Sequence, residues 1–278
     1  MLKNTFCHIP GIGAKTERGL WSAGVRSWEA VGAPAAMPFS PAKADRVRRH
    51  VAESAEHLAA GDPSYFCDRL PANQHWRVFP EFEHAAAYVD IETTGLGGPG
   101  DYITTIVLYD GHSIRHYVQG RNLRDFAADI ARYPLIVTYN GKTFDVPFIR
   151  NYLGCPMRQA HIDLRYVLAG LGYRGGLKGC ERQLGLDRAD LADLDGYFAV
   201  LLWFDFLHNR NDRALETLLA YNTLDVIHLA ALVRLAYNLR VEQTPFARSH
   251  RLAVPTPPPL PFQADRDTIE RIKRQAEW

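Results

Sequence analysis

Two acidic residues at the end of an apolar segment are the first candidates for chemistry in this sequence. Asp90 and Glu92 lie two residues apart where the β-rich segment 85–92 ends, so on a strand both side chains face the same side. Like charges placed in this way repel each other, and a divalent cation would remove that cost. Taken alone, the pair is weak evidence, and a solvated strand end is its more common explanation.

Two more segments carry a carboxylate among apolar neighbours. Asp145 opens an expected helix after the buried strand 134–140, which is where α/β sheets place their sites, although a carboxylate there also favours a helix N-terminus. Tyr221 and Asp225 are four residues apart on an apolar helix and therefore share one face. A buried carboxylate needs a partner, which could be a metal ion or a neighbouring loop.

Strands interleaved with helices must position these side chains. The patterns predict strands over 85–92, 102–110, 112–118 and 134–140 with a shorter one near 161–167, and helices over 122–133, through Phe148 and Tyr152, and over 177–184, 196–208 and 213–240. Asp110 and Gly111 are expected to form a hairpin turn. This order predicts an α/β fold with a mixed sheet flanked by helices.

The chain divides into four parts on this interpretation. They are a small helical module over 1–60, a polar connector with prolines over 61–84, the α/β domain over 85–245, and a Pro-rich spacer with a C-terminal helix ending at Trp278 over 246–278. The segment 32–41, inside the first part, has the composition of a loop.

Composition narrows the class of protein. Among 278 residues, 47% are hydrophobic, and 32 Lys and Arg nearly balance 31 Asp and Glu, so that any surface for nucleic acid must be local. The four cysteines form no CxxC pair, which predicts reduced thiols and no zinc site. We expect a cytoplasmic protein without a membrane span, because no apolar run approaches about 20 residues and the first residues lack a secretion signal.

Together, the order and spacing of these motifs resemble the DEDD exonuclease superfamily, which has the ribonuclease H-like fold. The Y-x-x-x-D pattern of Tyr221 and Asp225 is similar to the tyrosine (DEDDy) class, and Ala220 excludes the histidine variant. The resemblance implies a 3′–5′ exonuclease whose substrate is DNA or RNA. It also implies that Tyr221 positions water and that two metal ions are held by Asp90, Glu92, Asp145 and Asp225.

Further motifs extend the resemblance over about residues 76–240. The motif N-G-x-x-F-D-V-P-F at 140–148 is similar to the proofreading exonuclease motif of B-family polymerases, and GGLKGCERQLG at 175–185 resembles the YprB-like branch of ribonuclease H-like domains. By the pattern of the family, Thr93 and Leu96 contact the terminal nucleotide, and Asn140 hydrogen-bonds near the scissile bond.

Hydrolysis of a phosphodiester needs an ionised water and a means of neutralising charge at phosphorus, which two ions roughly 3.5–4 Å apart provide. Ligands that are all oxygens favour Mg²⁺ or Mn²⁺. Tyr221, with an ordinary pKa near 10, is a poor general base and is better interpreted as an orienter of water.

At the N-terminus, FCHIPGIGAKTERGL resembles the hairpin half of a helix-hairpin-helix module. Backbone N–H groups of the turn from Gly11 to Gly13 would bind a phosphate, assisted by Lys15 and Arg18. Because only nine residues precede Pro10, a purely structural helix-turn is the alternative.

Two rival functions follow from the same fold. The first is a catalytically inactive nucleic-acid-binding or scaffold module, which would gain nothing from four carboxylates and a tyrosine in these places. The second is another ribonuclease H-like enzyme, such as an endonuclease or a strand-transfer enzyme, against which the Y-x-x-x-D pattern argues. The sequence indicates nothing about protein partners.

Overall fold

A five-stranded sheet forms the centre of the computed structural model, which describes residues 1–32 and 37–276. The strand order is β3-β2-β1-β4-β5; β1 pairs antiparallel with β2 and parallel with β4. The strands are β1 (Ala86–Thr93), β2 (Ile103–Tyr109), β3 (Ile114–Val118), β4 (Leu135–Thr138) and β5 (Ala160–Asp163). The predicted mixed sheet flanked by helices is therefore confirmed.

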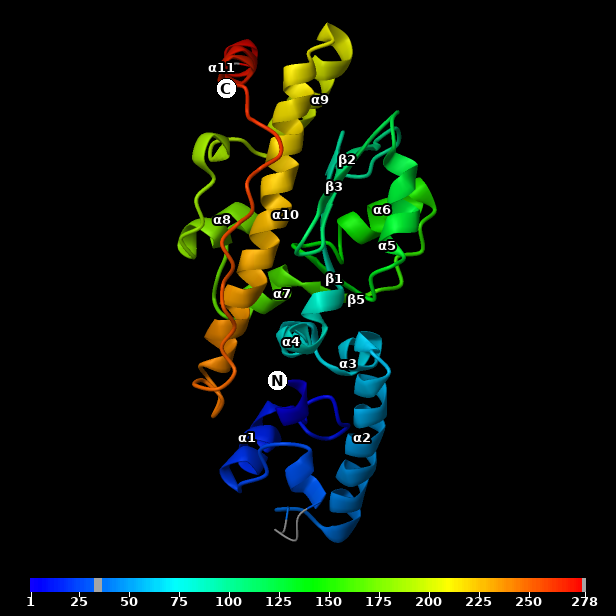
Figure 1. Cartoon of the computed structure of the whole chain (residues 1–278), viewed down its shortest axis with the longest axis vertical. Helices are drawn as coiled ribbons and strands as arrows, with labels where there is room; N and C mark the ends of the chain where they lie inside the picture. The colour runs from blue at the N-terminus through cyan, green and yellow to red at the C-terminus, as the bar shows by residue number, and fades with distance from the viewer. Residues whose placement is uncertain (33–36, 277–278) are drawn as a thin grey trace.

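Helices cover both faces of this sheet (Figure 1). On one face, η5 (Leu123–Asp125), α5 (Phe126–Ile130) and α6 (Asp145–Leu153) pack against alternate residues of β1 such as Ala87 and Val89. On the other face, Tyr88 packs with the apolar residues of a long helix, α10 (Asp212–Val241). The remaining helices of this domain are α7 (Leu164–Ala169), α8 (Gly176–Gln183), η6 (Ala189–Leu191) and α9 (Gly196–Asn209).

The helix α10 is long and apolar enough to cross a membrane by length and composition alone. However, 89% of its most apolar window is buried inside the protein, as in the core helix of a globular domain. It contacts β1, β2 and β4, so that its middle turns face the end of β1.

The segment 161–167 is not a single strand. Here β5 ends at Asp163, and α7 begins at the next residue, because the Asp163 carboxylate accepts the Arg165 N–H at 3.0 Å and so caps the helix. The predicted strand thus forms only in the first half of this segment.

The expected connector, 61–84, is also largely helical. It consists of α3 (Pro63–Arg69), η3 (Ala72–Arg77) and α4 (Phe79–Phe82), followed by η4 (Glu83–Ala85). Prolines that indicate a connector in the sequence lie in the first turns of α3 and α4, where a missing N–H costs nothing.

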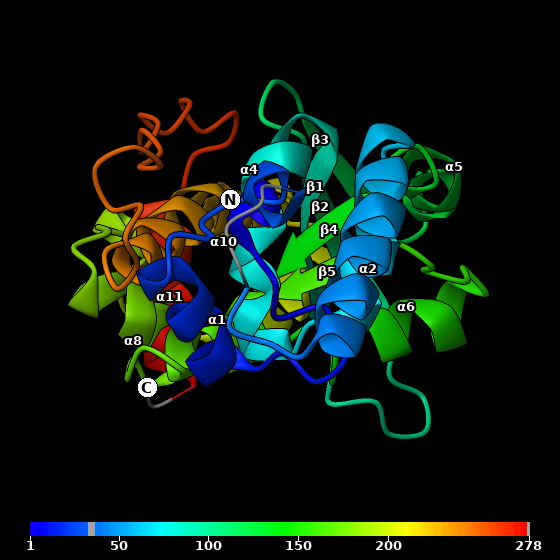
Figure 2. The same ribbon diagram turned by 90° about the horizontal axis from the view of Figure 1, so that it is seen from below.

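Helical segments form the N-terminal part, which lies beyond the lower end of the sheet in Figure 1 and is seen from below in Figure 2. They are η1 (Leu2–Asn4), α1 (Ala14–Ser22), η2 (Glu29–Gly32) and α2 (Pro41–Ala59). One hydrophobic cluster continues from Phe6 and Leu20 through Phe66 to Tyr237 of α10. The domain boundaries at 60, 84 and 245 stay predictions, as does phosphate binding by the exposed turn at Gly11.

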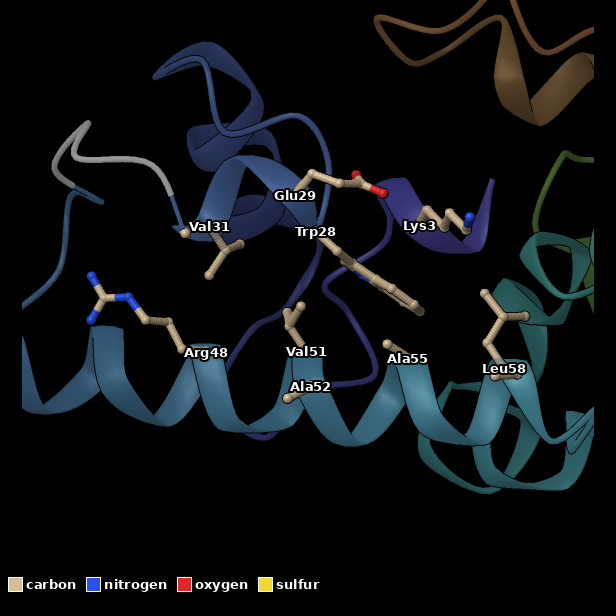
Figure 3. A pocket seen from close by; sticks show the side chains of 11 residues that line it. Lys3, Trp28, Glu29, Val31, Arg48, Val51, Ala52, Ala55 and Leu58 are labelled. Atoms are coloured by element: carbon tan, nitrogen blue, oxygen red, sulfur yellow. The ribbon is translucent and has the colours of Figure 1, made fainter.

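An apolar groove of about 590 Å³ lies between α2 and the segments η1 and η2 (Figure 3). Trp28, Val31 and Val51 line it, with Lys3 and Arg48 at its rim. Glu29 is its single lining carboxylate among the described residues, so the groove has no cluster of metal ligands.

The C-terminal part runs back along α10 without regular structure and ends in α11 (Arg266–Gln275) (Figure 1). Ile269 and Ile272 of α11 are buried in a cluster with α9 and the first half of α10. The expected helix end at Trp278 lies outside the described residues, and so do residues 33–36 of the expected loop 32–41.

Glu17 joins the N-terminal part to the segment before the sheet. Its carboxylate is 1% exposed, accepts the N–H groups of Phe6 and Cys7, and pairs with the Arg77 guanidinium at 2.8 Å. We expect Glu17→Gln to lower the free energy of unfolding by about 3 kcal/mol or more, because it leaves a buried arginine unpaired.

Chemical denaturation followed by circular dichroism measures this loss. The exposed Glu56→Gln serves as the control, with an expected change within about 0.5 kcal/mol. Equal stabilities of the two variants would contradict the role given to Glu17.

Candidate metal-binding site

Carboxylates from β1 and α10 meet at one place in the structure. Because alternate residues of β1 face opposite sides, Asp90 and Glu92 share the side of Tyr88, toward α10. Asp225 lies in the middle of α10, and one oxygen from each of the three residues lies within 4.8 Å of the other two. Such a group of oxygen ligands could hold a divalent metal ion.

Asp145 lies beside this group of three carboxylates. Among the described residues, the group itself does not include Asp145. It is the first residue of α6, is 3% exposed, and the backbone N–H of Ile91 lies close enough to its carboxylate to lower its pKa. That N–H lies on β1 between the other two acidic residues, so Asp145 lines the same cleft.

The turn before α6 is held by the end of β5. The Asp163 carboxylate accepts the backbone N–H groups of Asn140 at 2.8 Å and Lys142 at 3.0 Å. A side chain at Gly141 would place its Cβ 2.2 Å from Thr138 Oγ1, so the close approach here requires glycine. These contacts fix where Asn140 and Asp145 enter the cleft.

Asn222 orients the first carboxylate. Its amide Nδ2 donates to Asp90 Oδ2 at 2.7 Å, while its Oδ1 accepts from the Thr105 hydroxyl at 3.0 Å. Because the amide is held on β2 and is fully buried, the Asp90 carboxylate has one oxygen fixed and the other free for an ion.

Burial and mutual repulsion disfavour the ionised forms of these carboxylic acids. Burial is the largest cause in each case, and it raises the pKa of Asp90 and Glu92 well above the ordinary range. It raises the pKa of Asp145 to about 7 and also raises that of Asp225. Neighbouring carboxylates add to the rise at Asp90 and Glu92. A bound cation would reverse this balance by favouring the ionised forms.

Two cations lie behind the carboxylates. The Arg188 guanidinium is 2.5 Å from Asp225 Oδ1, and the Lys178 ammonium is buried without a hydrogen-bond partner in the described part of the chain. Both lie near the ring of Tyr221, at 5.2 Å and 4.8 Å from its centroid. Burial lowers the pKa of Lys178, whereas Asp225 and Glu92 act to raise it.

Tyr221 lies one turn before Asp225 and is 4% exposed. Burial, followed by the charges of Asp225 and Glu92, raises its pKa, so the hydroxyl keeps its proton at neutral pH. A protonated hydroxyl donates a hydrogen bond and is not a base.

The cleft at this site has a volume of about 650 Å³. Its lining includes Asp90, Glu92, Asn140, Phe144, Asp145, Arg165 and Asp225. Thr93 is the last residue of β1 and Leu96 lies three residues further on; like Tyr221, neither is among the described residues that line the cleft. Leu96 is 91% exposed, whereas Thr93 is buried and its hydroxyl donates to the Gly95 carbonyl at 2.6 Å.

These donors fit a divalent cation such as Mg²⁺ or Mn²⁺. They are all carboxylate oxygens, one of them is already oriented by an amide, and their charges are unfavourable without a counter-ion. The site therefore supports metal binding on the chemistry of its own residues.

Several supporting residues were not found from the sequence. Asn222 could have been found, since it is one turn before Asp225 in the same motif. Arg188, Glu181 and Asp163 gave no signal, because their roles depend on loops and strand ends that come together only in the fold.

Comparisons with known proteins agree with this architecture. Residues 87–237 match the family model of the RNase H superfamily. The Bacillus subtilis protein YprB is 30% identical over 167 residues, which cover 52% of this chain and 40% of YprB. The chain thus spans less than half the length of that curated relative.

A solved structure with a similar region is the family B DNA polymerase from the hyperthermophilic archaeon Pyrobaculum calidifontis. The match has a TM-score of 0.36 and 17% identity, and covers 56% of this chain and 29% of the polymerase.

The raised pKa values predict how Mn²⁺ stabilises the protein at different pH. Because the folded pKa of Asp145 is about 7, above its ordinary 3.8, the metal-free protein loses stability as the pH rises between these values. The raised pKa values of Asp90, Glu92 and Asp225 have the same effect on stability. The positive charges of Lys178 and Arg188 lower the pKa of Glu92 and Asp225 but do not cancel the rise. Bound Mn²⁺ would remove this loss of stability, because a cation favours the ionised carboxylates.

We therefore expect Mn²⁺ to raise the melting temperature more at about pH 8 than at about pH 6. Differential scanning fluorimetry at both pH values, against EDTA, measures the difference. Asp145→Asn should shrink it, and an equal Mn²⁺ effect at the two pH values would contradict the assignment.

Proposed function

Because the chain belongs to the RNase H superfamily, we propose that it is a metal-dependent 3′–5′ exonuclease that hydrolyses phosphodiester bonds of DNA or RNA. The observation that carries the proposal is the meeting of Asp90, Glu92 and Asp225 within 4.8 Å, with Asp145 in the same cleft. A fold alone does not fix an activity, and these side chains supply the chemistry.

Two divalent ions, Mg²⁺ or Mn²⁺, would lower the pKa of the attacking water and neutralise charge on the leaving 3′ oxygen. The residues that hold them are Asp90, Glu92, Asp145 and Asp225. Asn222 keeps Asp90 in its orientation through a hydrogen bond, and Asp145 is positioned as the first residue of α6. The chain thus contributes a rigid set of ligands whose charge matches that of the ions.

Tyr221 acts as a donor toward the attacking water. Its hydroxyl lies on the helix that carries Asp225 and stays protonated, which suits an orienting group and not a general base. The nearby ammonium of Lys178 and guanidinium of Arg188 make this side of the site positive.

Residues around the cleft would bind the 3′ end. Leu96 is an almost fully exposed leucine directly after the strand that carries the ligands, a position suited to wedging against the terminal base. Thr93 is proposed to contact the same nucleotide. The Asn140 Oδ1 accepts from Thr143 and Arg165, which leaves its amide N–H groups for the substrate.

The direct test is hydrolysis of 5′-labelled single- and double-stranded DNA and RNA with Mg²⁺ or Mn²⁺. We expect products shortened from the 3′ end, and Asp225→Asn should lower the rate more than about 100-fold, since several kcal/mol of transition-state stabilisation are lost. Asp212→Asn, exposed on the same helix, should keep the wild-type rate.

Binding without cleavage would identify the protein as an inactive nucleic-acid-binding module. Internal cuts in a substrate with a blocked 3′ end would identify an endonuclease. Either result would replace the proposed activity.

A second variant separates the tyrosine from the metal ligands. We expect Tyr221→Phe to lower kcat by about 10- to 100-fold, since only an orienting hydrogen bond is lost, and to leave Mn²⁺ affinity unchanged. Tyr237→Phe, buried further along α10, is the matched control. Rate assays with Mn²⁺ calorimetry measure both quantities, and weaker Mn²⁺ binding by Tyr221→Phe would instead make the hydroxyl a ligand.

A further inference from the structure

Arg188 is a buried arginine in direct contact with one of the metal-binding carboxylates. Its side chain is 5% exposed and lies between Asp225, 2.5 Å from Nη2, and Glu181, whose two oxygens are each 2.8 Å from Nη1. Burial of a guanidinium is costly unless its charge is paired, and here two carboxylates share it.

The carboxylate of Glu181 is itself held from the other side. His228 Nδ1 lies 2.7 Å from Glu181 Oε1, and His228 is one turn after Asp225 on α10. The contacts therefore form a closed chain that leaves α10 at His228 and returns to it at Asp225. Such a chain restrains the side chains of both Arg188 and Asp225.

The backbone directly after Arg188 has an unusual conformation. The next residue, Ala189, has a φ of +46°, which is uncommon for a residue with a side chain, and its N–H donates to the Asp187 carboxylate at 2.9 Å. Asp190 accepts two hydrogen bonds from Arg266 of α11. The loop thus holds Arg188 in place from both sides.

Arg188 is too buried to contact a substrate, and the metal-binding residue that it contacts directly is Asp225. The guanidinium forms an ion pair with Asp225 at Oδ1, and one oxygen of the same carboxylate lies within 4.8 Å of oxygens of Asp90 and Glu92. A planar fork can hold Glu181 and Asp225 at once, whereas the point charge of a lysine cannot.

We propose that Arg188 is a positioning residue for metal binding, which holds the Asp225 carboxylate in the orientation that completes the ion site. This inference rests on the metal site of the proposed function. The same contact could have the opposite role, in which the guanidinium competes with the ion for Asp225. The two predict opposite effects of removing the positive charge.

The experiment measures Mn²⁺ affinity of the full chain by calorimetry and by the loss of the electron paramagnetic resonance signal of free Mn²⁺. Removal of groups that orient metal ligands typically costs 10- to 100-fold in affinity. We expect Arg188→Gln to weaken Mn²⁺ binding about 10-fold or more, and Arg188→Lys to restore only part of it. Arg182→Gln, exposed on α8, is the matched control and should bind as the wild type does.

Melting temperatures in EDTA separate positioning from folding, since a structural role alone would lower stability without a specific loss of Mn²⁺ affinity. If Arg188→Gln does not fold, Arg188→Lys and Glu181→Gln carry the same test, with weaker Mn²⁺ binding expected in both. Unchanged affinity in every folded variant would overturn the inference.

Tighter Mn²⁺ binding by Arg188→Gln would also overturn it and would make Arg188 a competitor of the ion. A wild-type chain that binds no Mn²⁺ would overturn both this inference and the proposed metal-dependent function. Wild-type binding with unaffected variants would overturn only the role of Arg188.

Discussion

The carboxylates of Asp90, Glu92 and Asp225 repel one another at close range, in a cleft that removes much of the water that would otherwise screen them. The fold must supply enough favourable energy elsewhere to hold them there. It does so with a sheet whose central strands are apolar on both faces and with a 30-residue helix buried over most of its length. Asn222 then donates a hydrogen bond to Asp90, and Arg188 forms an ion pair with Asp225.

The two faces of the sheet contribute differently to this arrangement. The face covered by α5 and α6 is an apolar cluster, in which Asp145 enters only at the first residue of α6. The face toward α10 combines apolar packing near Tyr88 with the polar site, which begins two residues further along β1 at Asp90. Because β1 alternates sides, a shift of one residue in its pairing would bury Asp90 in the apolar cluster, so register and site are fixed together.

Much of the sheet and the ligands could be predicted from the sequence, because the signals are local. Alternation at Tyr88 to Glu92 and the spacing of Tyr221 and Asp225 are set by the geometry of one strand and one helix. The helices α3 and α4 were missed because a proline in the first turn of a helix resembles one in a loop. The pairing of Arg188 with Asp225 has no periodic signal, since a loop and a helix meet only after folding.

Asn222 and Asp90 are hydrogen-bonded although 132 residues separate them in the chain. A ribosome that adds about 5–20 residues per second needs roughly 7–26 seconds to make the segment between them. During that interval the nascent protein has β1 with its two acidic residues but lacks α10. The complete set of ligands exists only after the last helix of the sheet domain has emerged, so the order of synthesis itself delays the appearance of the site.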